Sequence, residues 1–258
     1  MSDNRAPRRI KSVGIAFDIL KILRNEGGAT VTEIAGAIDR TPGTTHTYLA
    51  TMCDKGYVKV EDGEYQVGLF ALPLGEYVRA NSRLYQIGKP EVDKLARKTG
   101  EAAHLVVESH SREILLYEQF GADAVGEDLY TQIKGYPRRN LHCSAASKAI
   151  IAHLDESRRN EILDGYQLVS RTPNTITEEE VLREELEQVR SDGYASNDEE
   201  QITGVRAVAA PIIHEETIYG AISLSAPTSR MPQDQFMNTA PEQILDVANV
   251  IEVNIQTP

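Results

Sequence analysis

The stretch TEIAGAIDRTPGTTHTYLATMCDKG, residues 32–56, decides the fold of the N-terminal part of this chain. Thr32 is placed as the N-cap of a short helix over residues 33–38. A three-residue turn that ends in Thr41 follows. Thr41 then caps a second helix, which has proline at its first position, where a missing N–H costs nothing, and which runs to about Lys55 before a glycine stops it. Two helices joined by a tight turn are typical of a helix-turn-helix.

The residues on either side of this stretch extend the pattern to a winged helix. Apolar side chains recur at three- and four-residue spacing over residues 12–26, which predicts a helix before the pair. After the pair, residues 57–60 and 64–67 fit two short strands around the sequence Glu-Asp-Gly, which is a hairpin signal. Three helices followed by a hairpin predict a winged helix-turn-helix domain over residues 1–67.

The rest of the chain predicts a helical linker and a second, larger domain. Residues 68–81 are apolar enough to form a packed helix, which we expect to contact a partner subunit. Residues 82–258 mix the helical and strand periodicities. We expect helices at 84–98, 144–153, 178–191 and 233–253, and strands at 103–107, 114–119, 129–134, 206–213 and 217–225. Thr177 and Glu180 are the expected capping box of the third helix. This order predicts an α+β sandwich with a C-terminal GAF-like mixed α/β effector domain.

The charge is divided unevenly between these two parts. The net charge of -12 is unfavourable for a DNA-binding protein, because phosphate contacts need Lys and Arg. However, residues 1–70 hold nine basic and nine acidic side chains, so the negative charge falls on the remainder. This asymmetry favours a neutral DNA-binding head on an acidic body. The acidic excess also fits a salt-loving host, an interpretation that stays open because many mesophilic cytosolic proteins are equally acidic.

Length, hydropathy and cysteines indicate a cytoplasmic protein of two domains. No run approaches the ~18 apolar residues that a membrane span needs, and no apolar stretch follows the basic N-terminus to act as a signal peptide. Cys53 and Cys143 lie far apart without a Cys-x-x-Cys pattern, so neither a disulfide framework nor a zinc site is indicated. We expect no cofactor and no metal.

The second helix of the helix-turn-helix carries the candidate DNA contacts. Hydroxyls near a helix N-terminus can donate to phosphates, and longer side chains can reach base edges in the major groove. We expect Tyr48 or Leu49 to face the core with Met52, and the threonines and His46 to face outward. The wing adds a basic residue, and the N-terminal segment is either an arm in the minor groove or a solvated tail. The candidate DNA-binding residues are Thr44, Thr45, His46, Thr47, Tyr48, Thr51, Lys59 and Arg9.

A different interpretation of this helix is that its threonines only cap and solvate it, because no Arg or Lys lies between Gly43 and Asp54. The helix, turn and wing around it favour DNA binding.

Several motifs along nearly the whole chain resemble the IclR family of transcription regulators. In the N-terminal part these are TVTEIA at 30–35, TTH at 44–46, GYV at 56–58 and YQVG at 65–68. The C-terminal motifs are more specific: LHCSAASKA at 141–149, IT at 176–177, VRSDGYA at 189–195, NDEE at 197–200, GVRAVAAPI at 204–212 and AISLSAP at 221–227.

The resemblance implies a transcription regulator rather than an enzyme. It implies homodimers, often paired as tetramers, that bind palindromic promoter sites in double-stranded DNA, with a small organic effector in the C-terminal domain. We interpret the targets as catabolic genes for sugar, organic-acid or amino-acid degradation. The helix position after His46 is often arginine in the family and is Thr47 here, so we expect a different base preference.

The resemblance also implies the place of the effector. Members that bind small oxo-acids hold the carboxylate with backbone N–H groups in the turn that matches Ala145 and Ala146, and with two strand hydroxyls. An acidic residue and a cysteine complete that pocket in the family, where this chain has Asn197 and Ala207, and Ser147 stands where the family usually has glycine. We therefore expect a larger or differently polar ligand than a two- or three-carbon oxo-acid, such as a sugar acid.

Reasoning from the residues agrees in outline. Ser144 can cap the helix that follows it, and free N–H groups at such an N-terminus favour an anion, although they can also cap and do nothing more. Ser223 and Ser225 share one strand face by period two and line either solvent or a polar cavity. The candidate effector-binding residues are Ser144, Ala145, Ala146, Asn197, Ala207, Ser223 and Ser225.

Two other functions compete with this one. His142 beside Cys143 would suit a thiol nucleophile, but adjacent strand residues point to opposite faces and no third orienting group is evident. An architectural DNA-binding or interaction protein with a vestigial sensor domain is the other. The remaining histidines in the second domain show no ligand spacing, and we expect surface or structural roles for them: His104, His110, His153 and His214.

Overall fold

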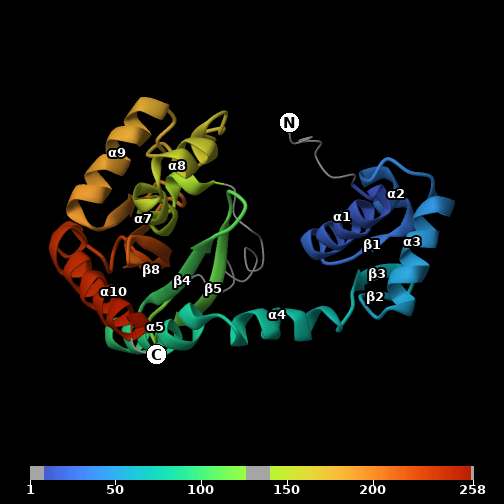
Figure 1. The fold of residues 1–258 in the computed structure, drawn as a ribbon, viewed down its shortest axis with the longest axis horizontal. Coiled ribbons are helices and arrows are strands. Elements are labelled where there is room, and N and C mark those ends of the chain that lie inside the picture. Colours follow the sequence, from blue (N-terminus) through green and yellow to red (C-terminus); the bar gives the residue numbers. More distant parts are fainter. Residues whose placement is uncertain (1–8, 126–139, 257–258) are drawn as a thin grey trace, which may run out of the picture. The chain divides into compact units, whose positions relative to one another are not determined.

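The computed structural model describes residues 9–125 and 140–256, and the chain divides into two compact units, residues 1–78 and 79–258 (Figure 1). The predicted strand at 129–134 lies outside the described residues. None of the described helices is long and apolar enough to cross a membrane.

The first unit is a winged helix-turn-helix, as predicted. Its described helices are α1 (Lys11–Glu26), α2 (Val31–Ala37) and α3 (Pro42–Asp54). The wing is the antiparallel hairpin of β2 (Val58–Glu61) and β3 (Glu64–Val67), and a two-residue strand that the sequence did not reveal, β1 (Ala29–Thr30), pairs with β3. The buried core of this unit contains Ile19, Leu23, Ile34, Leu49, Met52 and Val58.

The cap of α2 differs from the prediction. Thr30, and not Thr32, is the N-cap, because it forms a capping box with Glu33. Glu33 Oε2 accepts a hydrogen bond from Thr30 N at 2.8 Å, and Thr30 Oγ1 accepts one from Glu33 N at 3.4 Å. A capping box needs the acid three residues after the cap, and this spacing selects Thr30. The cap of α3 is Thr41, as predicted.

A helix occupies most of the predicted linker. α4 (Ala71–Ala80) begins three residues later than the predicted segment, and the division between the two units falls within it. No residue of α4 is buried. The expected domain limits at residues 67 and 81 stay a prediction.

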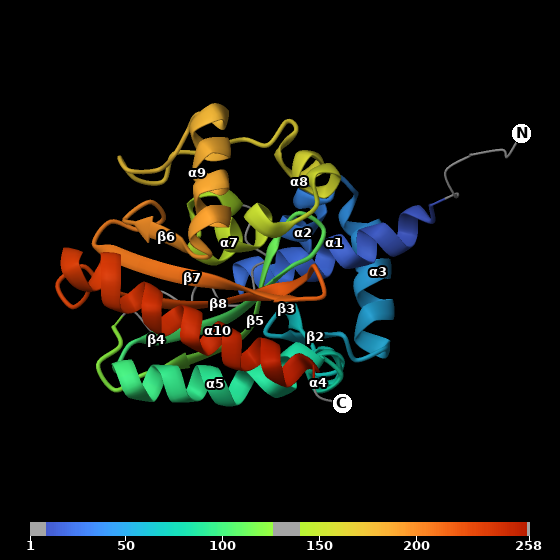
Figure 2. The ribbon, with the colours of Figure 1, turned by 60° about the vertical axis from the view of Figure 1, so that its left-hand side comes forward.

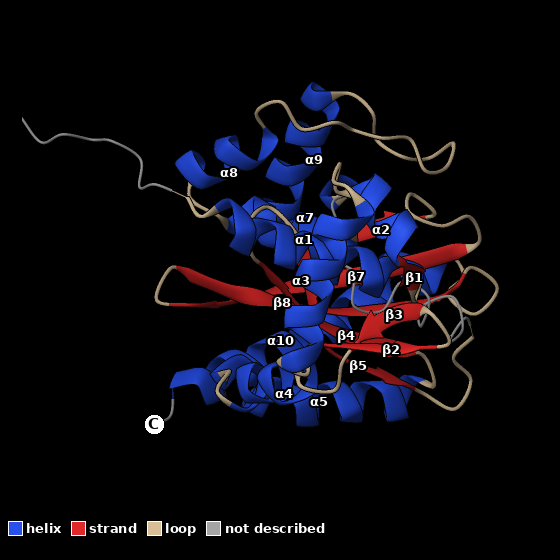
Figure 3. Ribbon diagram, turned by 90° about the vertical axis from the view of Figure 1, so that its right-hand side faces the viewer, coloured by secondary structure: helices blue, strands red, loops and turns tan. Residues whose placement is uncertain are grey.

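The second unit is the predicted α+β sandwich. Its described strands form an antiparallel sheet in the order β5-β4-β8-β7-β6. The strands are β4 (Ala102–Glu108), β5 (Glu113–Phe120), β6 (Ala195–Asp198), β7 (Val205–His214) and β8 (Thr217–Pro227). The short strand β6 was not predicted. β7 and β8 are consecutive and make the long hairpin of the sheet (Figure 3).

Helices cover both faces of this sheet. α5 (Arg83–Thr99) and α10 (Ala240–Gln256) lie along one face, and α7 (Ala145–His153) and α9 (Glu179–Asp192) lie on the other (Figure 2). A short helix, α8 (Glu156–Leu163), which the sequence did not reveal, packs on the α7 side. The predicted helix from residue 233 opens with a π-helical turn, Gln235–Thr239, before α10. The predicted capping box of α9 is wrong: its N-cap is Glu178, with no side-chain cap bond.

The alternation of strand residues separates the two faces. Large side chains face α5 and α10, among them Leu105, Val208, Ile222 and Leu224. The residues between them face α7 and are mostly alanine, among them Ala195, Ala207, Ala209 and Ala221. Small side chains on this face let α7 approach the sheet and leave room beside it. The candidate effector residues of β8 have the same alternation as Ala221.

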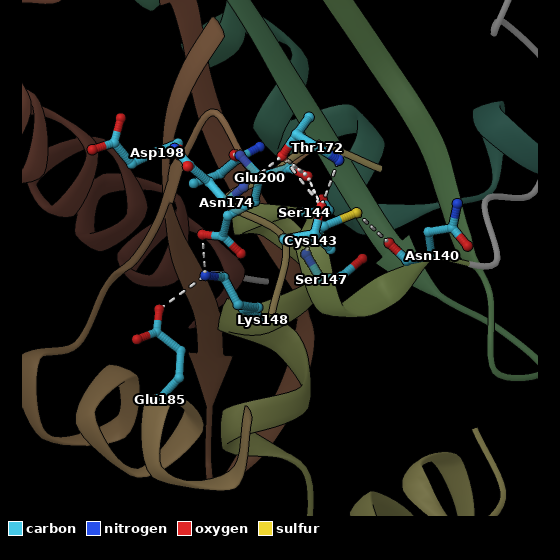
Figure 4. Close-up of polar contacts among 12 residues, drawn as sticks. Asn140, Cys143, Ser144, Ser147, Lys148, Thr172, Asn174, Glu185, Asp198 and Glu200 are labelled. Atoms are coloured by element: carbon cyan, nitrogen blue, oxygen red, sulfur yellow. Dashed lines mark hydrogen bonds and ion pairs between the residues drawn. The ribbon is translucent and has the colours of Figure 1, made fainter. Parts of the chain in front are cut away.

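A buried ion cluster fastens α7 to its neighbours. Lys148 on α7 is fully buried, and its Nζ donates to Glu185 on α9 at 2.9 Å and to Glu200 at 2.8 Å (Figure 4). Glu200 follows β6, and burial raises the pKa of its carboxyl in spite of the neighbouring lysine. The backbone of Glu200 is held as well, because Thr172 and Thr175 donate to its carbonyl oxygen.

Replacing Lys148 with alanine leaves the Glu200 carboxyl buried without its cation. We expect the free energy of unfolding to fall by about 3–5 kcal/mol, the cost of breaking a buried ion pair from one side. Urea denaturation of the whole chain measures this. Lys94→Ala is the matched control, because Lys94 is exposed where it pairs with Glu91, and such pairs contribute about 0–1 kcal/mol. Equal losses in the two variants would contradict the role of the cluster.

Candidate functional site

The predicted DNA-binding residues of α3 occupy different positions on the helix. Thr44, His46, Thr47 and Thr51 are exposed, and Tyr48 is half-buried. Two of the threonine hydroxyls donate to backbone oxygens one turn earlier: Thr47 Oγ1 to Gly43 O at 3.2 Å, and Thr51 Oγ1 to Thr47 O at 3.0 Å. The outer face therefore presents methyl groups and oxygen lone pairs around the imidazole of His46.

Thr45 does not belong to this outer face, and its predicted exposure is wrong. Its side chain is 0% exposed, and its Oγ1 has no hydrogen-bond partner in the part of the chain that the structure describes. Thr45 lies four residues before Leu49 and seven before Met52, both of them buried. This spacing places all three on the core face of the helix.

The two basic candidates lie outside α3. Lys59 is exposed on β2 of the wing, where its Nζ pairs with Glu61 Oε2 at 2.9 Å. Arg9 is exposed and precedes α1 by two positions. Both side chains are accessible to a phosphate, Lys59 at the cost of an exposed ion pair.

The seven predicted effector residues line one pocket on the α7 face of the second unit. The empty space measures about 360 Å³, including the mouth that opens to solvent. Its described lining residues also include five that the sequence did not reveal: His104, Val106, Glu113, Leu115 and Gln201.

One wall of the pocket is the start of α7. Ser144 caps this helix: its Oγ accepts a hydrogen bond from Ser147 N at 3.4 Å, and its carbonyl oxygen accepts one from Lys148 N at 2.9 Å. The N–H groups of Ala145 and Ala146 come before the first intrahelical bonds, so they have no acceptor within the helix. Such groups favour an anion.

The floor of the pocket carries two buried hydroxyls on β8. Ser223 is 5% exposed and Ser225 is 8% exposed. They lie opposite the small residues Ala209 and Ala207 of β7. No described residue makes a hydrogen bond to either hydroxyl. Of the two surroundings that the sequence left open, the serines have the polar cavity rather than solvent.

Asn197 is buried at the edge of the pocket and has a structural partner. It lies opposite Ala207 in the sheet, and its Oδ1 accepts a hydrogen bond from Glu200 N at 2.7 Å. Asn197 therefore links the pocket to the ion cluster around Lys148. Its amide nitrogen makes no hydrogen bond to any described residue.

The residues missed in the sequence come from β4 and β5. His104 is buried on β4 opposite Ser223, so a surface position is wrong for it. Glu113 is buried at the start of β5, and Ser147 Oγ donates to its Oε2 at 2.6 Å. The alternation along residues 102–108 places His104 on the same face as Val106, but only the strand order shows that this face meets Ser223.

The pair His142 and Cys143 does not form a nucleophilic site. Both are buried in a 3-10 turn, Leu141–Cys143, rather than in a strand. Burial raises the pKa of the Cys143 thiol to about 11, so the thiol is neutral near pH 7. Burial lowers the pKa of His142, whose ring contacts Tyr166 Oη and the carbonyl oxygen of Val169.

Two family models match the chain. The model of the C-terminal domain of the bacterial transcriptional regulator IclR matches residues 77–253. A model of a winged helix-turn-helix DNA-binding domain matches residues 14–59.

Similar proteins carry regulator names. The probable HTH-type transcriptional regulator ArcR of Halobacterium salinarum is 39% identical over 99% of this chain and 98% of the relative. The HTH-type transcriptional regulator XynR of Escherichia coli is 32% identical over 89% of this chain and 91% of the relative. A solved IclR homolog of Microbacterium hydrocarbonoxydans, complexed with 4-hydroxybenzoate, has the same fold, with a TM-score of 0.78, 21% identity, and coverage of 96% of this chain and 98% of that one.

Proposed function

The chain belongs to the IclR family of DNA-binding transcription regulators, and we propose that it controls catabolic genes in response to a carboxylic acid bound in the α7 pocket. The observation that supports this most is the convergence of seven motif residues from α7, β6, β7 and β8 on one pocket. The pocket combines free N–H groups at a helix start with two buried hydroxyls. Both kinds of donor suit a carboxylate.

The identity of the acid follows from where this pocket departs from the oxo-acid pattern. An amide at Asn197 removes a charge, and a methyl at Ala207 replaces a thiol and enlarges the cavity. We propose an acid larger or more polar than glyoxylate or pyruvate, such as a sugar acid. The Microbacterium homolog, which is complexed with an aromatic carboxylic acid, agrees with this class. The controlled genes would then serve sugar, organic-acid or amino-acid degradation.

The proposed DNA-binding residues are the predicted ones without Thr45. On α3 they are Thr44, His46, Thr47 and Thr51, with Tyr48 at the edge of the face. Lys59 on the wing and Arg9 before α1 would contact phosphates. The operator is expected to be palindromic, because a two-fold protein dimer matches a two-fold site.

The proposed assembly is a homodimer or homotetramer. α4 and the residues before it expose large apolar side chains, which monomeric proteins rarely gather in one stretch. These are Leu69, Phe70, Leu72, Leu74, Tyr77 and Val78. A second copy of this chain would cover them.

Replacing His46 and Thr47 together with alanine should weaken binding to the operator at least about tenfold, because each base contact contributes about 1–3 kcal/mol. Binding to unrelated DNA should change little. Fluorescence anisotropy with the promoter fragment measures both, and Thr45→Val, a change in the buried face of the same helix, is the matched control. Unchanged operator affinity of the folded double variant would remove α3 as the recognition helix.

Replacing Ser223 and Ser225 together with alanine should weaken effector binding about tenfold or more. A hydrogen bond to a charged group contributes about 1.5–3 kcal/mol, and 1.4 kcal/mol is a factor of ten. Calorimetry measures the loss, and DNA binding without effector should be unaffected. Ser196→Ala is the control, since Ser196 has the opposite alternation to Asn197 on β6. Full effector affinity in the double variant would place the site elsewhere.

Light scattering at micromolar concentration should give two or four times the chain mass of 28.5 kDa. Leu74→Glu with Val78→Glu, one helical turn apart, should shift the mass toward the monomer, because both charges would enter the proposed interface. A monomeric mass for the natural chain, in the salt of its host, would contradict the assembly.

A further inference from the structure

The effector pocket has a second, acidic end that the family motifs do not include. Glu113 of β5 and His104 of β4 line the same pocket as Ser223 and Ser225. Both are more than nine-tenths buried. Their chemistry differs from that of the α7 start, because a carboxylate only accepts hydrogen bonds.

A β-bulge brings Glu113 to the pocket. The pairing of β4 with β5 shifts register between Leu105 and Val106, so that Glu118 lies opposite His104 while Leu115 lies opposite Val106. The shift changes which residues of β5 face α7, and Glu113 follows Leu115 on that side. There the hydroxyl of Ser147 donates to Glu113 Oε2 at 2.6 Å, which fixes the carboxyl against α7.

The charges of the lining determine what can approach this end. Among its described lining residues the pocket has no lysine and no arginine, and Glu113 is the one acidic residue. A ligand that is anionic along its whole length would meet repulsion there. A ligand with hydrogen-bond donors at this end would not, and the hydroxyl of Ser147 already shows that a neutral donor suits Glu113.

The other polar groups at the pocket both donate and accept. The amides of Asn197 and Gln201 have both functions, and so does a neutral imidazole such as that of His104. His104 lies between Ser223 on β8 and Glu118 on β5, with its Nδ1 3.8 Å from Glu118 Oε2. It therefore connects the hydroxyl floor with the acidic edge of the sheet. Hydroxyl groups are the ligand groups that match such mixed partners.

We infer that the effector is a polyhydroxylated carboxylic acid. Its carboxylate lies at the start of α7 with Ser223 and Ser225, and its hydroxyls donate to Glu113 and exchange hydrogen bonds with His104. This inference rests on the proposed function of the pocket as a carboxylate site, and it makes Glu113 and His104 determinants of specificity.

Calorimetry on the full chain with three six-carbon acids tests the inference: gluconate or galactonate, hexanoate, and 6-aminohexanoate. These probes share the carboxylate and differ in carrying hydroxyls, no polar group, or an ammonium. We expect one of the sugar acids to bind at least about tenfold more tightly than hexanoate. Glu113→Gln should lower that affinity about tenfold and leave hexanoate unchanged. Glu187→Gln, an exposed site on α9, is the matched control.

Each outcome has one meaning. Equal binding of hexanoate and the sugar acids overturns the inference and leaves the carboxylate site standing. Preference for 6-aminohexanoate, lost in Glu113→Gln, overturns it in favour of an amine at the acidic end. No binding by any acid overturns both the inference and the carboxylate site. If Glu113→Gln does not fold, His104→Gln takes its place, with the same loss expected for the sugar acid alone.

Discussion

The pairing of Lys148 is the constraint on which the second domain depends. A fully buried ammonium group needs carboxylates around it, and the two that surround it come from α9 and from the segment after β6. One charge thus fixes three elements that are far apart in the sequence. The bond from Asn197 to Glu200 N then carries that order into the pocket. The site is positioned by electrostatics on one side and by alanine packing against the sheet on the other.

Much of the architecture was predictable because its signals are local. The helices of the winged helix, the proline at the start of α3 and the hairpin after it follow from caps, periodicity and turn residues. The errors have local causes too. Thr32 was preferred to Thr30 as a cap because the position of Glu33 was not used, and Thr45 was placed outward because the phase of α3 was not fixed against Leu49.

The parts that could not be predicted depend on contacts between distant segments. β6 is four residues long and polar, and it is a strand because β7 pairs with it. His104 and Glu113 reach the pocket through the strand order and a bulge, neither of which is written in a local pattern. The motif residues of the pocket were placed through the resemblance to a family, and the physical pattern added only that Ser144 caps and that Ser223 and Ser225 share a face.

The hydroxyls of Thr47 and Thr51 already bond to the backbone of their own helix. What α3 offers to a DNA groove is therefore mainly methyl surface and one imidazole, with no lysine or arginine between residues 43 and 54. Methyl groups can pack on the 5-methyl group of thymine. Such contacts displace no counterions from the phosphates, so the part of the binding free energy that they supply does not fall as ionic strength rises. A recognition helix of this composition separates the reading of sequence from the concentration of salt, and leaves the salt dependence to the few basic residues around it.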